Sequence, residues 1–281
     1  MSRSSSFVKD TVRPIALAFV FTTLGFALRA VLAILLDVEL SKLVASVINF
    51  VLAAVGAFYV FPKLLKQPFG PVGLGEYTRR LGFFLPRKAW KHVGLGVLLA
   101  ACTLGGMLVS ALLTGRYVVD WSRVSLSHIV FSLNPGVWEE FFYRGIITIV
   151  LLKRAQSVRQ AALIQIVLFG LAHIKGFDLL SWVDVLSVMI IAVAFTYAAY
   201  KTRALIAGIV FHFLHDVFLL FVQVPDGSST GFAEKATFFA ALWIGVAVAC
   251  LLVKVATDTL GVQAQAELYQ VAPSSEQNKD I

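Results

Sequence analysis

Charged residues are scarce in this chain of 281 residues. They make up 14% of it, whereas soluble domains average about 25%. Hydrophobic residues make up 59%, above the roughly 45–50% that is typical of soluble domains. This balance argues against a soluble globular enzyme, a disordered chain and a basic nucleic-acid-binding protein. It is the composition of a chain whose solvent is mostly lipid.

Cysteine is almost absent, and so are the motifs in which cysteine does chemistry. Cys102 and Cys250 both lie within long apolar runs, and they form neither a disulfide framework nor a CxxC metal pair. We interpret both as small hydrophobic side chains packed between helices. The HExxH pattern of zinc peptidases is absent as well.

Long apolar runs dominate what is present. A membrane-crossing helix needs about 20 mostly apolar residues. Eight segments approach or reach this length: 15–36, 43–61, 93–113, 137–152, 158–172, 182–200, 204–222 and 236–255. The fifth is short and the fourth begins with polar residues, so we expect seven or eight spans. Lipid offers no water to unpaired backbone groups, and no segment alternates like a barrel strand. We therefore predict an all-α, polytopic membrane helical bundle with about eight transmembrane helices.

Lysine and arginine are unequally distributed among the connections, and this predicts the orientation. The N-terminal segment and the second, fourth and sixth connections are basic, while the connections between them are poorer in these residues. By the positive-inside rule, we expect both termini in the cytoplasm. The small size of the chain is typical of a prokaryotic protein, so we expect the plasma membrane as its location. The net charge of +8 is then explained by topology and contact with anionic lipid, without a nucleic-acid partner.

Ionisable residues within the spans include three short clusters, all in the second half of the chain. Such residues are costly in lipid, so each is a functional-site hypothesis by default. In the first cluster, Glu140 and Arg144 are four residues apart, share a helix face and can pair. Glu139 points about 100° away from Glu140 and is free for chemistry. The alternative is an ion pair that only fixes helix packing, which leaves Glu139 unexplained.

The other two clusters supply histidines. His173 ends the second cluster, and in the third His212 and Asp216 share a face while His215 lies one residue off it. Such a His–Asp pair could ligate a metal, relay protons, polarise a carbonyl or simply hold helices together. Counted from the cytoplasmic ends of their helices, all three clusters lie roughly 20 Å deep. This equal depth predicts that they converge on one site.

The three clusters together resemble the CPBP family, the CAAX proteases and bacteriocin-processing enzymes that are also called the Abi family. Its pattern is EExxxR, FxxxH and HxxxN or HxxxD on successive helices. Here the matching residues are Glu139, Glu140 and Arg144, then Phe169 and His173, then His212 and Asp216. The resemblance covers about residues 125–222 and implies an intramembrane endopeptidase.

The resemblance also implies a role for each residue. Glu139 with His173 would activate a water as general base, and Glu140 would be held by Arg144. His212 with Asp216 would position or stabilise the tetrahedral oxyanion. This chemistry needs no serine or cysteine nucleophile, because a buried carboxylate can accept the proton of water and a nearby donor can stabilise the developing charge.

One position departs from the family's usual pattern. Many members have Asn where this chain has Asp216, and an ionised Asp cannot donate a hydrogen bond as Asn does. We therefore expect Asp216 to orient His212, to be protonated, or to ligate a metal. A divalent metal such as zinc could bind Glu139, His173, His212 and Asp216. The family has been described both as metalloproteases and as glutamate-based proteases.

We expect four regions along the chain. Residues 1–124 form N-terminal transmembrane helices with a basic cytoplasmic loop at 62–92, and residues 125–222 form the catalytic core. Residues 223–256 form the last transmembrane helix, and residues 257–281 form a polar tail that is predicted to be disordered. Within the basic loop, an amphipathic stretch around 77–84 is typical of a helix at the membrane surface.

Two other functions fit the same residues. A proton-coupled transporter also buries such groups at mid-depth, but it often shows inverted repeats, and here the polar groups occupy one half of the chain. A non-catalytic membrane protein that binds a peptide or confers bacteriocin immunity is the other alternative. The expected partners are the lipid bilayer and a peptide or membrane-protein substrate. Prenylated C-terminal peptides, peptide precursors and membrane-protein tails are the substrate classes considered.

Overall fold

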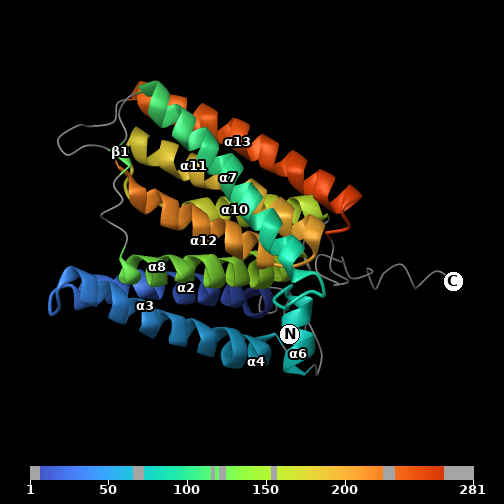
Figure 1. Ribbon diagram of the computed structural model, residues 1–281. Helices are drawn as coiled ribbons and strands as arrows, with labels where there is room; N and C mark the ends of the chain where they lie inside the picture. The colour runs from blue at the N-terminus through green and yellow to red at the C-terminus, as the bar shows by residue number, and fades with distance from the viewer. Residues whose placement is uncertain are drawn as a thin grey trace.

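The predicted all-α class is confirmed by a computed structural model that describes residues 7–65, 73–114, 118–119, 125–152, 157–223 and 232–262. Those residues form a helical bundle (Figure 1). Its α-helices are α2 Arg13–Leu32, α3 Val38–Val55, α4 Phe61–Leu64, α6 Leu74–Arg80, α7 Ala89–Thr114, α8 Leu126–Asn134, α9 Thr148–Leu152, α10 Val158–Leu171, α11 Leu179–Thr202, α12 Ile206–Phe221 and α13 Phe232–Thr259. Its π-helical segments are η1 Val8–Val12, η2 Gly56–Val60 and η4 Pro135–Ile147. Two short strands pair in antiparallel: β1 Val118–Val119, between α7 and α8, and β2 Val222–Gln223, directly after α12.

Every predicted span coincides with helix, but the helices differ in length. Within the described residues, four are long and apolar enough to cross a membrane: Leu40–Leu64, Ala89–Ser110, Leu179–Thr202 and Lys235–Thr259. Val158–Leu171 and Ile206–Leu219 are apolar but shorter. Eight spans therefore stay a prediction. The helix expected around 77–84 is shifted toward the N-terminus: α6 covers Leu74–Arg80, and residues 81–84 are not helical. Its position at the membrane surface stays a prediction. Residues 66–72 of the basic loop, the basic residues Lys153 and Arg154, and the tail from 263 to 281 lie outside the described residues.

Short polar side chains at the helix starts explain where several helices begin. The side chains of Asp37, Ser125 and Ser157 each accept a backbone N–H three residues ahead, as N-cap residues do. Asp178 caps α11 by accepting from two backbone N–H groups. The Ser181 hydroxyl also donates to Asp178, and together these hydrogen bonds lower the pKa of the Asp178 carboxyl. These caps place the helix starts outside the apolar runs.

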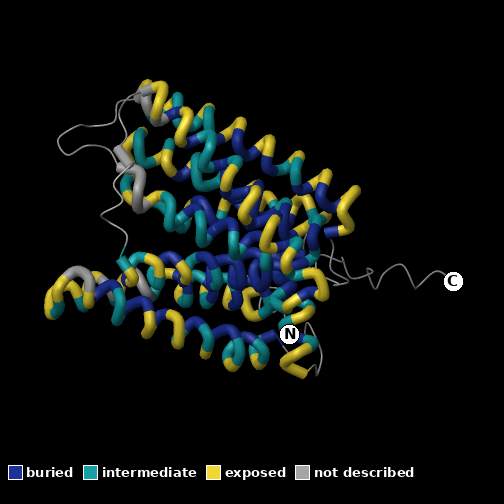
Figure 2. Tube along the Cα trace, viewed as in Figure 1, coloured by how far each residue is buried: buried dark blue, intermediate teal, exposed yellow. Residues whose placement is uncertain are grey.

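The helices form two packed groups with α10 and α12 between them (Figure 1). In one group, α2, α3 and α8 surround η4; in the other, α7, α11 and α13 pack on one another. Figure 2 shows the buried residues gathered where the groups meet, with exposed residues along the outer faces. Many exposed residues are large and apolar, such as Val51, Leu163 and Ile244. Apolar outer surfaces of this kind suit contact with lipid.

One continuous helical stretch changes its hydrogen-bond pattern at the proline. Pro135 lacks an N–H group, and α8 passes there into the 13-residue π-helical segment η4. In a π-helix each N–H bonds to the carbonyl five residues back, and such segments are frequent at functional sites. At Pro135 the helix thus changes type and does not end.

Small residues let α7 and α13 approach closely. A Cβ atom on Gly106 would lie 2.6 Å from the carbonyl oxygen of Ala241, and one on Gly245 would lie 3.0 Å from that of Cys102. Close approach through small residues is the usual way in which membrane helices associate. Cys102 and Cys250 are free thiols on these two helices and are partly buried.

This packing generates a test with a control one residue away. Gly106→Ala inserts a methyl group against the α13 backbone, and we expect a cost of about 1–3 kcal/mol from overpacking. In Gly105→Ala the new Cβ meets nothing within 4 Å, and alanine favours a helix over glycine. Thermal unfolding in detergent should show a lower Tm for Gly106→Ala and an equal or higher Tm for Gly105→Ala. Equal loss in both variants would contradict the close contact.

Candidate active site

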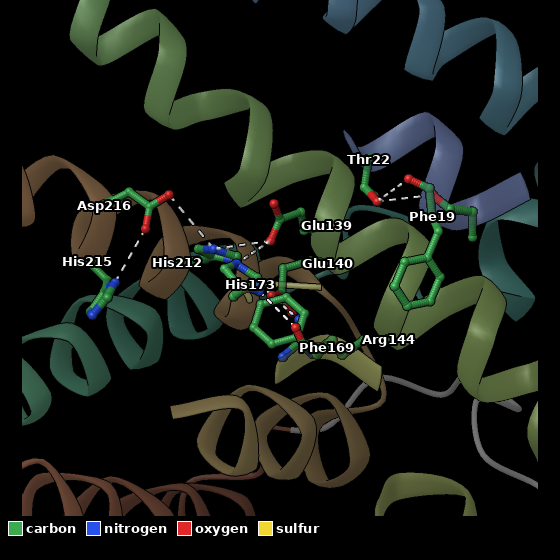
Figure 3. A network of polar contacts seen from close by, with 11 residues as sticks. Phe19, Thr22, Glu139, Glu140, Arg144, Phe169, His173, His212, His215 and Asp216 are labelled. Carbon is green, nitrogen blue, oxygen red and sulfur yellow. Dashed lines mark hydrogen bonds and ion pairs between the residues drawn. The ribbon is translucent and has the colours of Figure 1, made fainter. Parts of the chain in front are cut away.

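The carboxylate of Glu139 projects from η4 into the interior of the bundle (Figure 3). Its residue is 6% exposed, and its Oε2 atom makes no hydrogen bond within the described residues. Buried polar atoms rarely go without a hydrogen bond, and those that do are often functional or bound to water. Glu139 therefore has the environment of a reactive group, as the adjacent Glu139-Glu140 pair predicts.

The neighbouring Glu140 is fully buried and is held from two sides. Arg144 Nη1 donates to Glu140 Oε1 over 2.9 Å, and His212 Nδ1 lies 2.9 Å from the same oxygen. The i, i+4 ion pair that the spacing predicts is present. The contact with His212 joins η4 to α12 through a charge-assisted hydrogen bond.

The guanidinium of Arg144 lies between two aromatic rings. Its Cζ is 4.1 Å from the centroid of Phe169 on α10 and 4.9 Å from that of Phe195 on α11. A cation facing aromatic rings at this range is stabilised by their quadrupoles, more strongly when it is desolvated. Phe195 also stacks on the His212 ring, with centroids 4.7 Å apart. Rings from α10 and α11 thus hold the Arg144 cation that pairs with Glu140.

His173 follows the last turn of α10, and its side chain is 32% exposed. Its Nδ1 lies 2.8 Å from the Phe169 carbonyl oxygen. A carbonyl can only accept, so Nδ1 carries the proton, and Nε2 of the neutral ring is left as an acceptor. His212 is arranged alike, because its Nδ1 faces the Glu140 carboxylate.

Both imidazoles therefore present Nε2 to Glu139. The distances from Glu139 Oε2 are 3.9 Å to His173 Nε2 and 3.8 Å to His212 Nε2. Polar atoms beyond direct hydrogen-bond range can be bridged by a water. A water between these three atoms would donate one hydrogen bond to the carboxylate and the other to an imidazole. The sequence placed Glu139, His173 and His212 at one depth, and the structure brings them to one point (Figure 3).

Asp216 makes no hydrogen bond to His212, the ring that we expected it to orient. Its Oδ2 is 3.8 Å from His212 Nε2, too far for a hydrogen bond, and its Oδ1 is 3.3 Å from His215 Nδ1. The carboxylate that orients His212 is Glu140, because it reaches Nδ1 across the α12–η4 contact. Asp216 lies at the partly exposed edge of the cluster, next to both histidines.

A small polar cavity adjoins Glu139 between α2, α3, α8 and η4. Among its lining atoms, Asn49 Oδ1, Asn134 Oδ1 and Trp138 Nε1 are buried and make no hydrogen bond within the described residues. Its space of about 20 Å³ for solvent exceeds the roughly 10–15 Å³ that one water needs. The cavity can therefore hold a water beside the carboxylate.

Sequence reasoning missed two residues of this region. Asn49 was overlooked because only ionisable residues were considered, although Lys42, Ser46 and Asn49 recur at helical spacing within an apolar run. Gly208 was overlooked as well, and a Cβ there would lie 2.9 Å from Glu140 Oε2. Gly208 is one turn before His212 on the same face, so its lack of a side chain lets α12 approach the carboxylate.

Zinc binding by Glu139, His173, His212 and Asp216 stays a prediction. In the part of the chain that the structure describes, no three or more His, Cys, Asp or Glu side chains are arranged to hold a metal ion. No step of the reaction proposed below therefore runs through a metal.

The helices that form this site match a known family. Residues 121–218 match the family model described as Type II CAAX prenyl endopeptidase Rce1-like. This segment, about a third of the chain, is similar to that family. The match confirms the predicted resemblance to CPBP family intramembrane proteases, and it includes every predicted site residue. No curated protein and no solved structure matches the chain.

The Rce1-like match supports the coarse functional assignment. The matched segment is similar to CAAX-type prenyl endopeptidases, which are hydrolases. The four long apolar helices agree with a membrane protein. The roles of individual residues are a separate matter and follow from the geometry above.

The ion pair of the Rce1-like segment generates a stability test. Arg144→Ala leaves the Glu140 carboxylate buried without its cation, and breaking such a pair costs about 3–5 kcal/mol. We expect a lower Tm in detergent and a loss of activity. Glu139→Gln is the control, because Glu139 Oε2 makes no hydrogen bond within the described residues, and its Tm should match that of the wild type. Equal destabilisation by both changes would contradict this division between a structural and a reactive carboxylate.

Proposed function

We propose that this protein hydrolyses a peptide bond of a prenylated, C-terminal CAAX-type substrate within the membrane, through a water activated by Glu139 and His173. One observation carries the proposal. The Glu139 carboxylate, without a hydrogen bond at Oε2, faces two imidazole Nε2 atoms whose Nδ1 atoms are both held by acceptors. This is the arrangement of a general base that has a water to deprotonate.

The proposed reaction has two proton transfers. Glu139 accepts a proton from the water while the water oxygen bonds to the carbonyl carbon of the substrate. His173 Nε2 accepts the second hydrogen bond of the water and aligns it. When the C–N bond breaks, the protonated Glu139 gives the proton to the leaving amine. The carboxylate is regenerated, and no covalent intermediate with the protein forms.

His212 is assigned the developing negative charge. Glu140 bonds its Nδ1, so its Nε2 points into the site, and a protonated ring would donate from there to the oxyanion. Glu140 and Asp216 lie on opposite sides of the ring, 2.9 Å from Nδ1 and 3.8 Å from Nε2. Glu140 and Arg144 act by positioning, because they touch His212 or each other and face away from the proposed water.

Cleavage by the purified protein tests this function. We expect hydrolysis of a farnesylated CAAX peptide in liposomes, and a loss of about 10²–10⁴-fold in rate for Glu139→Gln, the contribution typical of a general base. Glu76→Gln is the matched control, since it removes a partly exposed carboxylate of α6 far from the site. The same peptide without its prenyl group serves as substrate control.

Each result separates one part of the proposal from the rest. Full activity of Glu139→Gln would refute the assigned base. Equal cleavage of the unmodified peptide would refute the prenyl specificity but keep the endopeptidase. No cleavage of any peptide would favour the transporter or the immunity protein. A chelator that abolishes cleavage, with recovery on adding zinc, would show that metal takes part.

We further propose that both termini face the cytoplasm of a cell whose plasma membrane holds the protein. The basic residues of the described chain support this, because several gather where α7 begins and α11 and α13 end. Lys91 Nζ donates to the Leu260 carbonyl there, and Lys201 pairs with Asp258. The positive-inside rule places such an end in the cytoplasm.

Cysteine labelling of whole cells measures this orientation. In a variant with Cys102 and Cys250 replaced by alanine, a cysteine at exposed Leu85 should be protected from an impermeant reagent. A cysteine at exposed Phe177, two residues before the start of α11 and at the other end of the bundle, should be modified. The reverse pattern would overturn the orientation. Permeabilised cells, in which both sites should react, control for accessibility.

A further inference from the structure

A second pocket lies at the basic end of the bundle, away from the candidate active site. It is formed by the end of α6, the connection from α6 to α7, the first turn of α7 and the chain after α13. Its volume is about 500 Å³, within the range of roughly 300–1,000 Å³ that is usual for ligand pockets. None of its lining residues belongs to the site described above.

The charge in this pocket has one sign. Arg79, Arg87, Lys88, Lys91 and His92 line it, and none of its lining residues in the described part of the chain is acidic. No ion pair involving Arg79, Arg87 or Lys88 occurs among the described residues. The adjacent Arg80 differs, because it pairs with Glu76 on its own helix. Clustered cations without acidic partners create a potential that attracts an anion.

A buried histidine also lines the pocket, and it belongs to the start of a long helix. His92 is only 1% exposed. It lies in the first turn of the 26-residue helix α7, where the positive end of the helix dipole adds to the basic side chains. The start of α7 therefore increases the positive potential that the four cations create in the pocket.

Exposed apolar side chains accompany the pocket and favour a lipid as the carrier of the anion. Leu85 lines the pocket, Trp90 precedes Lys91 and Leu260 precedes Gly261, and they are 78%, 72% and 61% exposed. Exposed tryptophan is typical of the membrane–water interface, where its ring lies at headgroup level. Lys91 connects the two features, because its Nζ lies 5.7 Å from the Trp90 ring and bonds to the Leu260 carbonyl.

We propose that this pocket binds the phosphate group of an anionic phospholipid. The four cations would contact phosphate oxygens, and the exposed apolar side chains beside the pocket would contact the acyl chains. Basic pockets on the cytoplasmic side of membrane helices bind anionic headgroups in this manner. The site lies where α6, α7 and the end of α13 meet, so an occupied pocket would hold these elements together.

The test uses the full-length protein in detergent micelles that contain either phosphatidylglycerol or phosphatidylcholine. Thermal unfolding is followed as lipid is added. We expect phosphatidylglycerol to raise the Tm above the value in phosphatidylcholine, less so at high salt because screening weakens the attraction. The double variant Arg87→Gln/Lys88→Gln should lose this rise or need about tenfold more lipid, since each cation near a membrane surface contributes to lipid attraction. Both side chains are exposed, so its Tm in phosphatidylcholine should equal that of the wild type and shows that it folds.

A charge-matched control separates this site from general attraction. Arg80→Gln/Lys254→Gln also removes two charges, but both cations pair with an acid on their own helix. It should keep the response to phosphatidylglycerol. Equal loss in both double variants, or equal response of all proteins, would overturn the proposal. Inorganic phosphate is a separate arm: if it alone gives the full rise in wild type, and Arg87→Gln/Lys88→Gln abolishes that rise, the ligand is free phosphate and the lipid assignment is wrong.

Discussion

The arrangement around the site depends on one buried carboxylate, that of Glu140. A charge in the interior of a membrane protein is costly unless it is paired, and Glu140 satisfies this by contacting both Arg144 and His212. Arg144 in turn lies between Phe169 and Phe195. Through these contacts η4, α10, α11 and α12 are fixed relative to one another. These contacts also position the reactive groups, because Glu139 directly precedes Glu140 in η4 and Glu140 holds His212 by its Nδ1.

The sequence allowed us to predict which residues lie at this site, but only some of the contacts between them. Glu140 with Arg144 followed from their spacing, since both lie on one helix and local geometry decides the contact. The partner of His212 could not be predicted in the same way. Asp216 has the spacing for it, but Glu140 reaches His212 from another helix, and that depends on how closely α12 approaches η4. Gly208 permits this approach, and its meaning becomes clear only once the helices are packed.

The fold shows the same division between local and tertiary information. Apolar runs predicted where helices occur, and short polar residues such as Ser157 and Asp178 mark their starts. The runs could not establish how many helices cross the bilayer, since α10 and α12 are apolar but short, and hydropathy alone does not distinguish a spanning helix from a buried one. The π-helical hydrogen bonding of η4 could not be predicted either, because the proline predicts a missing hydrogen bond but not the pattern that replaces it.

The bond between His173 Nδ1 and the Phe169 carbonyl has a consequence for how the site forms. The last four carbonyls of an α-helix have no partner within it, and Phe169 belongs to that turn of α10. The imidazole therefore serves as a C-terminal cap of α10 while its other nitrogen faces Glu139. Winding of the final turn and orientation of the ring are a single event. If that turn frays, Nε2 is no longer directed at Glu139, so the local stability of one helix end sets the fraction of molecules in which the three groups are aligned.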